Sequence, residues 1–463
     1  MQAEACRDPK PRPMHVSEKP APPASAANSP LSSGSGPRVA VVGSGIAGLA
    51  AAWRLRGAAS ITLFEAAGHF GGHVHTVDAE IDGRQEAVDT GFLVLNRRTY
   101  PGLLELFAEL GVELAPAQMS FSVQAPWPRG ARVEWSGAGP NAVFAQRANL
   151  YRPGFWRMLR DIRRFNREAT ALARAGHPGP GPSVGEFLQR GAYSGEFRHG
   201  YFLPMAACIW SCPTARMLEF PMLSMARFCD NHALLQLRGR PQWLSVRGGA
   251  RGYVRRMLEH VPDKRLRTPV LRLRRDARGV ELLHAGGAER FDHVVLACHS
   301  DQALGLLERP LALESEVLSA VSYQRNRALL HLDASVLPRA RRAWAAWNYE
   351  AGDDDARQVC VHYLINRLQP LRARSPVLVS LNPLREPARH SVLREIDYAH
   401  PVFDAAAIAA QRRLPELQGT LNTWYCGAWC GHGFHEDGLR AGYAAADALL
   451  RRLARQRDWP RAA

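Results

Sequence analysis

Apolar residues first gather into a regular pattern at Val39, where a short apolar run is followed by a glycine cluster and an alanine-rich stretch. A second apolar run, residues 60–64, comes directly after that stretch. A strand, a helix and a second strand in this order form a βαβ unit, whose two strands are parallel and joined by a right-handed crossover. The pattern therefore predicts a parallel sheet that begins near Val39.

Later segments extend this pattern. Two alternating runs on either side of residues 276–279 predict a β-hairpin between 268 and 283, and residues 291–298 predict another buried strand. The first 36 residues are rich in Pro, Ser and Ala and show no periodicity, which is typical of a disordered tail. We therefore predict a discontinuous domain around the parallel sheet and a second domain inserted into it twice. The predicted segments are 1–36 for the tail, 37–115, 246–300 and 416–463 for the first domain, and 116–245 and 301–415 for the second.

The glycine cluster after the first strand has the spacing G-x-G-x-x-G, with Gly43, Gly45 and Gly48 at the three glycine positions. In dinucleotide-binding units the first glycine permits a tight turn, the second lets backbone approach a pyrophosphate, and the third allows close packing of helix on strand. Glu65 ends the second strand, 22 residues after Gly43, where an acid binds ribose hydroxyls. The spacing predicts a dinucleotide site that favours an unphosphorylated ribose.

A second motif follows, in which Glu65 and Ala66 precede the glycine pair Gly71-Gly72. With these residues the chain resembles the flavin-containing amine oxidase and phytoene desaturase superfamily, in which such a glycine pair wraps the FAD diphosphate. The family usually has an arginine after the pair, whereas this chain has His73. Because histidine titrates near neutral pH, the charge of His73 on a phosphate would depend on pH.

The resemblance extends to residue 446 and implies a fold. We expect an α/β protein with a discontinuous, Rossmann-like FAD-binding domain and an inserted α+β substrate domain. The segment 88–92 resembles the family segment beside the isoalloxazine ring, and residues 424–442 resemble the closing flavin motif, with Ala428 where an Asp is usual. The implied FAD-binding residues are Gly43, Gly45, Ile46, Ala47, Gly48, Glu65, Ala66, Gly71, Gly72, His73, Gly91, Phe92, Val270, Gly427, Gly438 and Leu439.

The candidate active site lacks a residue that most amine-oxidising relatives carry, a lysine that holds a water near the flavin. The corresponding strand, residues 323–331, contains no lysine, and Lys264 is the only lysine outside the predicted tail. Arginine is no substitute, because it does not lose its proton in proteins. A short loop near the closing motif carries several titratable groups, of which we predict His435 or Glu436 as the proton acceptor.

Residues 424–438 resemble more closely a bacterial subfamily of predicted NAD/FAD-binding proteins that accompany cyclopropane fatty acid synthase-type methyltransferases. This resemblance implies an FAD-dependent oxidoreductase that removes hydride from an apolar lipid or phospholipid acyl chain, with such a methyltransferase as a partner. Two alternatives stay open. One is an amine or polyene oxidase of the same superfamily, and the other is a non-catalytic flavoprotein in a lipid-modifying complex.

Charge adds a candidate surface. The net charge is +16, and 56 of the 59 basic residues are arginine. No zinc-finger or RNA-binding motif points to nucleic acid, so membrane lipid is the better anionic partner. In residues 154–165, Phe155, Leu159 and Ile162 share one helical face that arginines surround. Such a helix either lies in a membrane interface or covers the substrate domain with a solvated arginine face. We expect a cytoplasmic location and leave peripheral contact with the inner membrane open.

Cysteine spacing raises the question of a metal. Eight cysteines in 463 residues do not form a disulfide scaffold. Cys208 and Cys212, and likewise Cys426 and Cys430, have a spacing that zinc sites permit. Cys426 belongs to a predicted buried strand that precedes a cofactor glycine, so we expect no metal at these pairs.

Overall fold

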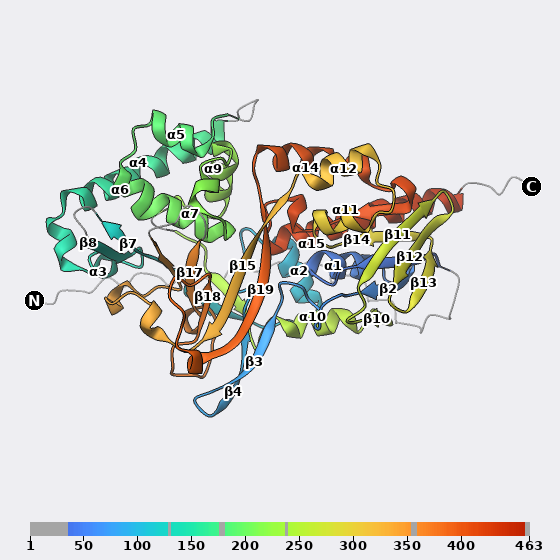
Figure 1. Ribbon diagram of the computed structural model, residues 1–463, viewed down its shortest axis with the longest axis horizontal. Coiled ribbons are helices and arrows are strands. Elements are labelled where there is room, and N and C mark those ends of the chain that lie inside the picture. The colour runs from blue at the N-terminus through green and yellow to red at the C-terminus, as the bar shows by residue number, and fades with distance from the viewer. Residues whose placement is uncertain (1–35, 128–130, 176–180, 237–238, 353–358, 459–463) are drawn as a thin grey trace, which may run out of the picture. The chain divides into compact units, whose positions relative to one another are not determined.

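The structure is a computed structural model that describes residues 36–127, 131–175, 181–236, 239–352 and 359–458. The predicted tail, residues 1–36, lies outside the described residues except for Gly36. The described chain mixes helices and strands, with a run of helices from α3 to α9 (residues 140–231) and a run of strands from β10 to β14 (residues 263–296) (Figure 1), and the predicted α/β class is confirmed.

A five-stranded parallel sheet forms the first layer, with strand order β10-β2-β1-β14-β20. Its strands are β1 (Arg38–Val42), β2 (Ser60–Phe64), β10 (Asp263–Arg265), β14 (His293–Leu296) and β20 (Thr423–Tyr425). Successive side chains of a strand point to opposite faces, so Val39 and Val41 pack on one face of the sheet and Ala40 and Val42 on the other. The sheet is therefore covered on both sides, as parallel sheets require.

Helices cover the face of Val39 and Val41. They are α1 (Ile46–Leu55), α2 (Pro101–Glu109), α10 (Arg251–Leu258) and α15 (His435–Asp458). The opposite face packs on the antiparallel sheet β11 (Val270–Asp276), β12 (Gly279–His284) and β13 (Gly287–Phe291), and on α11 (Ser300–Leu306), α12 (Ala312–Ser319) and α14 (Ala405–Leu417). The predicted hairpin is confirmed as the pair β11 and β12.

A seven-stranded sheet forms the second large layer, with strand order β19-β15-β18-β17-β16-β7-β8. Its strands are β7 (Phe121–Trp127), β8 (Ala131–Ser136), β15 (Ser322–His331), β16 (Trp347–Glu350), β17 (Cys360–Leu364), β18 (Leu378–Leu381) and β19 (Val392–Val402). They come from the two segments that the sequence assigns to the substrate domain. The domain boundaries themselves stay a prediction.

Helical segments pack beside this sheet on the left of Figure 1. They are α3 (Pro140–Val143), η1 (Arg147–Tyr151), α4 (Pro153–Ala175), α5 (Val184–Arg190), α6 (Gly195–Phe197), η2 (Arg198–Phe202), α7 (Leu203–Trp210), α8 (Thr214–Met217) and α9 (Met222–Asn231). There are also two small sheets among the described residues. One consists of β3 (Thr76–Ile81) and β4 (Arg84–Asp89), and the other of β5 (Leu95–Asn96), β6 (Leu114–Ala117) and β9 (Trp243–Val246). The remaining short segments are η3 (Ala334–Val336), η4 (Arg341–Ala343), α13 (Ile365–Leu368), η5 (Arg389–Ser391), η6 (Thr420–Asn422) and η7 (Ala428–Cys430).

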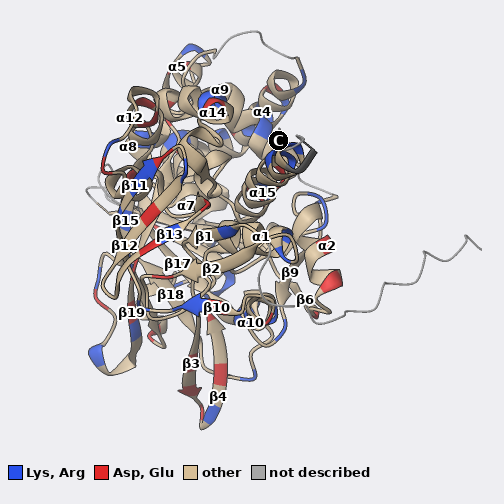
Figure 2. Cartoon of the chain, turned by 90° about the vertical axis from the view of Figure 1, so that its right-hand side faces the viewer, with Lys and Arg blue, Asp and Glu red and all other residues tan. Residues whose placement is uncertain are grey.

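Helix α4 decides between the two interpretations of the arginine-rich segment. Phe155, Ile162 and Phe165 are buried in the core, whereas Arg160, Arg163 and Arg167 are exposed. Figure 2 marks the arginines and lysines along the chain in blue. The apolar face of α4 is therefore used for packing and does not itself lie in a membrane. Within the described residues, no helix is both long enough and apolar enough to cross a bilayer.

Candidate functional site

A cavity of about 630 Å³ is lined by residues from the carboxyl end of the parallel sheet and from the seven-stranded sheet. Every strand of the seven-stranded sheet contributes residues to it, among them Phe121, Trp135, Trp347, Tyr363 and Leu381. The cavity thus has one wall from the predicted dinucleotide-binding motifs and another from the predicted substrate domain. Ligands of open α/β sheets bind at this carboxyl edge.

The turn between β1 and α1 has the geometry that a pyrophosphate needs. Gly43 has φ +102°, and a Cβ at Gly48 would lie 1.9 Å from the Gly43 carbonyl oxygen. A Cβ at Gly45, in contrast, would meet no atom within 4 Å, and Gly45 lines the cavity. The first and third glycines thus serve the turn and the packing of α1, and the second leaves space for a ligand to approach the backbone.

Glu65 follows β2 and is hydrogen-bonded to the turn that follows β1, at this end of the cavity. Its carboxylate accepts hydrogen bonds from the Ser44 backbone N–H (2.9 Å), the Ser44 hydroxyl and the Ala67 backbone N–H (2.8 Å). Glu65 also lines the cavity, so it lies where the sequence predicts an acid for a ribose. Ser44, inside the glycine motif, is a contact that sequence reasoning missed.

His73 is a buried polar group without a partner. Its Nε2 is buried and has no hydrogen bond within the described residues. The ring stacks on Tyr398, with centroids 5.0 Å apart, and lies edge-on to His400 at 5.2 Å. Burial first, and then nearby histidines such as His400 and His299, hold the pKa of His73 well below its usual range. Because an unpaired buried nitrogen costs about 1–3 kcal/mol, this environment suits a polar ligand atom in the cavity.

The structure brings most of the predicted cofactor residues to one cavity. Those that line it are Gly43, Gly45, Ile46, Ala47, Glu65, Gly71, Gly72, His73, Gly91, Phe92 and Gly427. Those outside the lining are Gly48, Ala66, Val270, Gly438 and Leu439. Gly438 lies against α1, since a Cβ there would meet Ile46 Cγ2 at 2.7 Å. Tyr398 and His400 also line the cavity; their alternation on β19 was a signal that could have found them.

The two predicted proton acceptors lie in the first turn of α15, not in a loop as the sequence suggested. Acidic side chains favour a helix N-terminus, which explains why the helix begins this early. Glu436 is outside the cavity lining, and its carboxylate accepts hydrogen bonds from the backbone N–H groups of Gly102 (3.0 Å) and Leu103 (2.9 Å) in α2. Its carboxylate oxygens therefore hold the start of α2.

His435 does line the cavity, and its ring stacks on Phe92 at a centroid distance of 3.9 Å. Burial lowers the pKa of His435 to about 3, so the ring is neutral. Its Nε2 is hydrogen-bonded to the Tyr253 hydroxyl, and burial holds the pKa of that tyrosine well above its usual range. Because Tyr253 keeps its proton, either partner can donate in this hydrogen bond, and the ring tautomer of His435 decides which one does. His435 thus lies at the cavity as a neutral ring, and its role as proton acceptor stays a prediction.

The other end of the cavity is apolar. Its walls include Met119, Trp135, Ile209, Trp210, Phe228, Leu234, Trp243 and Trp347. Among the described lining residues, the only charged side chains besides histidines are Glu65 and Arg240. Glu65 belongs to the dinucleotide end, whereas Arg240 is exposed and lies near Tyr201 in the apolar part. An apolar chain with one anionic group fits this distribution of charge.

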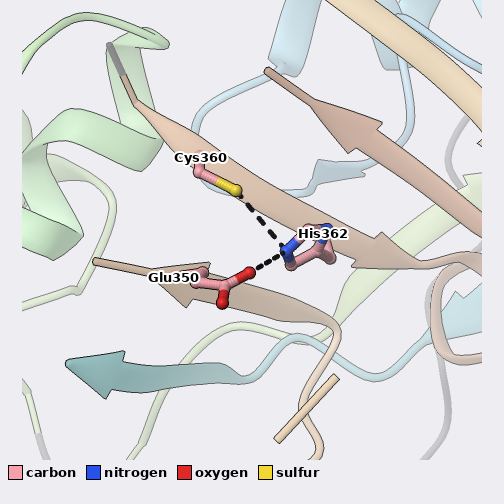
Figure 3. Close-up of side chains that lie close together, drawn as sticks. All are labelled: Glu350, Cys360 and His362. Atoms are coloured by element: carbon pink, nitrogen blue, oxygen red, sulfur yellow. Dashed lines mark hydrogen bonds and ion pairs between the residues drawn. The ribbon is translucent and has the colours of Figure 1, made fainter. Parts of the chain in front are cut away.

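A buried polar cluster lies on the opposite face of the seven-stranded sheet. Glu350 pairs with Cys360 across the strands, and His362 follows two positions later, so all three side chains share one face (Figure 3). Trp347 and Tyr363, which line the cavity, have the opposite parity. His362 Nε2 lies 3.2 Å from Glu350 Oε2 and 3.5 Å from Cys360 Sγ. The cluster is therefore separated from the cavity by the sheet itself.

These three side chains could hold a metal ion, since their ligand atoms lie within 4.8 Å of one another. Their present partners favour a hydrogen-bonded cluster instead. His362 Nδ1 bonds Ser380 Oγ at 2.7 Å, and the second oxygen of Glu350 faces Arg132 at 3.8 Å and Arg385 at 3.9 Å. At the two cysteine pairs considered from the sequence, burial raises the pKa of the Cys212 and Cys430 thiols to about 12, which opposes the thiolate form that zinc binds.

The environment of His362 in this cluster should make the folded protein less stable in mild alkali. Burial alone would lower the pKa of His362, but Cys360 and Glu350 beside the ring outweigh it and raise the pKa to about 9. Its protonated form therefore stabilises the folded protein below about pH 6.5, and this contribution of about 3 kcal/mol is lost as pH rises toward about 9. Urea unfolding between about pH 6.5 and 7.5, about one unit below the thiol pKa of the unfolded chain, should show the start of this loss. His362→Gln should be less stable at the lower pH and lack this dependence; an equal alkaline loss in the variant contradicts the assignment.

The fold and the cavity together define a flavin-dependent oxidoreductase with a dinucleotide site and an apolar substrate space. Residues 46–332, more than half of the chain, match the family model of flavin containing amine oxidoreductases. The chain belongs to this family, and its cofactor is FAD. A search of curated proteins found no match.

Solved structures of the same fold agree with this family. Putrescine oxidase bound to putrescine is 16% identical with a TM-score of 0.65, over 90% of this chain and 99% of that chain. Cyclohexylamine oxidase from Brevibacterium oxydans IH-35A is 18% identical with a TM-score of 0.63, over 91% and 100%. A fatty acid isomerase from P. acnes that produces CLA is 14% identical with a TM-score of 0.62, over 90% and 98%. The predicted superfamily, FAD cofactor and oxidoreductase class are confirmed.

Proposed function

We propose that this enzyme desaturates the acyl chain of a lipid that carries an anionic head group. One chain carbon gives up hydride, its neighbour gives up a proton to the predicted acceptor His435, and a double bond forms between them. Bound FAD supplies the hydride acceptor. The observation that carries the proposal is the cavity lining, in which an apolar wall has a single exposed cation, Arg240, and no acid outside the dinucleotide end within the described residues. A carboxylate or phosphate can pair with a guanidinium, while the acyl chain fills the apolar part.

The same charges disfavour the two other substrate classes. An alkyl amine is a cation near neutral pH, so Arg240 would repel it. Glu65, the one lining carboxylate, is held by Ser44 and Ala67 at the dinucleotide end. A polyene hydrocarbon would have nothing to pair with Arg240. Two of the similar structures are amine oxidases and one is a fatty acid isomerase, so the family's fold accommodates both kinds of substrate. An acyl-modifying methyltransferase as partner stays a prediction.

Anaerobic flavin reduction tests the proposal. Long-chain fatty acids and anionic phospholipids, dispersed in neutral detergent, are expected to bleach the oxidised flavin band, and alkyl amines of equal chain length are not. Bleaching by the amine or by a polyene, with none by the acyl lipids, would contradict the proposal.

Variants of Arg240 test whether this residue binds the anionic group of the substrate. Arg240→Gln should raise the fatty acid concentration for half-maximal reduction by about tenfold, and Arg240→Glu by about a hundredfold, with a smaller change in the limiting rate. Arg247, an exposed arginine outside the cavity lining, provides the control Arg247→Gln, which should behave as the wild type. Equal half-maximal concentrations in all variants would remove Arg240 from substrate binding.

A further inference from the structure

Three large apolar side chains are exposed together where η1 meets α4. Leu150 is 41% exposed, Tyr151 87% and Trp156 49%. We call these three residues the apolar tip. The indole N–H of Trp156 donates to the Leu150 carbonyl at 2.9 Å, and its ring lies 5.4 Å from the Phe144 ring. Trp156 is thus held in its exposed position by two contacts, and the tip is a formed surface.

The tip lies in a segment in which basic residues far outnumber acidic ones. Residues 139–167 contain seven arginines and one acid, Asp161, which is buried. Arg157 pairs with Glu196. The Arg160 and Arg167 side chains are 75% and 78% exposed and lie 4.0 Å from the carboxylates of their neighbours Asp161 and Glu168. Among the described carboxylates, none lies within ion-pair distance of the other exposed arginines of this segment, Arg147 and Arg163. We call these exposed arginines, 147, 160, 163 and 167, the arginine collar.

The tip is continuous with the cavity wall. Leu159 follows Trp156 by three positions, about one helical turn, and it lines the cavity together with Ile162 of the same helix and Val143 of α3. A single helix thus carries an exposed apolar residue on one turn and cavity wall on the next. The exposed tip and part of the apolar cavity wall are therefore carried by the same helix.

We infer that the apolar tip and the arginine collar dock this protein on an anionic lipid bilayer, from which the acyl substrate enters the cavity. Tryptophan and tyrosine favour the interface between head groups and acyl chains, and arginines near it are attracted to anionic lipids. This surface differs from the one that the sequence suggested, because the apolar face of α4 is buried and only its start, with η1, is exposed. The substrate route rests on the proposed function, whereas the docking itself does not.

Vesicle sedimentation of the FAD-loaded protein tests the inference. The wild type is expected to sediment with vesicles of phosphatidylglycerol mixed with phosphatidylcholine, to bind phosphatidylcholine alone much more weakly, and to be released by salt. Tyr151→Asp should lower the partition coefficient by about tenfold, because it replaces an inserted aromatic ring with a charge repelled by the lipid. Leu271→Asp is the matched control, since Leu271 is 54% exposed on β11, at the other end of the described part in Figure 1.

Two results would overturn the inference. One is the absence of sedimentation with anionic vesicles, and the other is equal sedimentation of wild type, Tyr151→Asp and Leu271→Asp. If the wild type does not bind vesicles but self-associates, and Tyr151→Asp makes it monomeric, the tip is a protein interface and not a lipid one. Because sedimentation uses neither turnover nor flavin reduction, a protein that docks but is reduced by no acyl lipid would contradict the proposed function alone.

Discussion

Replacing Gly45 with valine is expected to give a folded protein that no longer retains FAD. Gly45 has φ −61° and ψ 174°, an extended conformation that any residue adopts. A Cβ at this position meets no atom within 4 Å, so the side chain would extend into the cavity without disturbing the fold. It would occupy the space through which the pyrophosphate reaches the backbone. We expect the dissociation constant for FAD to rise by about a hundredfold or more, which corresponds to about 3 kcal/mol.

The measurement compares flavin absorbance per mole of protein after reconstitution with circular dichroism and thermal melting of the same sample. Gly48→Val is the matched contrast, since its Cβ would lie 1.9 Å from the Gly43 carbonyl oxygen and 3.1 Å from Ala297 Cβ. That variant should fail to fold or melt far below the wild type, whereas Gly45→Val should melt like the apoprotein. A Gly45→Val protein that holds stoichiometric FAD with unchanged affinity would contradict this account of the cavity.

The dinucleotide end of the site was predictable because its geometry is local. The turn at Gly43, the packing of Gly48 and the position of Glu65 all follow from one βαβ unit, in which β1 and β2 pair directly. Gly71 and Gly72 lie against the same turn, with a Cβ at Gly72 only 3.0 Å from Gly45 Cα. The positions of these glycines and of Glu65 depend only on residues close in the sequence or on the single pairing of β1 with β2. The sequence motifs were therefore enough to predict them.

The substrate end could not be predicted in the same way. Tyr398 and His400 reach the cavity only because β19 pairs with β15, and Trp347 only because β16 pairs with β7, more than 200 residues earlier in the chain. The role of Glu436 was missed for the same reason, since its partners, Gly102 and Leu103, start a distant helix. The sequence showed which residues have suitable chemistry, but the long-range pairings decide which of them meet.

Buried histidines should make this protein unstable in mild acid, well before its carboxylates are protonated. Burial lowers the pKa of His75, His232, His293, His331 and His400 to about 4 and that of His435 to about 3, and it also lowers those of His73 and His299. An unfolded histidine titrates near about pH 6.5. Unfolding therefore takes up protons below that pH, and the stability present above about pH 6.5 is lost as pH falls toward about 4.

Buried acids oppose this effect but are fewer. Burial raises the pKa of Asp89 to about 7 and also raises those of Glu436 and Asp437, so all three favour the folded state as pH falls. Each additional proton that the unfolded state binds lowers the free energy of unfolding by about 1.4 kcal/mol for every unit by which the pH falls. Even if only half of the eight histidines contribute fully, the free energy of unfolding should fall by several kcal/mol between about pH 6.5 and 5.

Urea unfolding of the FAD-loaded protein at a series of pH values measures this slope directly as a number of protons. His331 provides the sharpest variant, because it is buried outside the cavity lining and its Nε2 bonds only Ser380 within the described residues. His331→Asn is expected to lower the slope by about one proton, since it removes one group that charges on unfolding. His362→Gln is the comparison. The charge of His362 itself is complete below about pH 6.5, so this variant should lower the acid slope by much less than one proton, through the loss of its repulsion on His331. A wild-type protein whose stability is flat down to about pH 4.5 would show that these histidines are already protonated, or open to water, in the folded state.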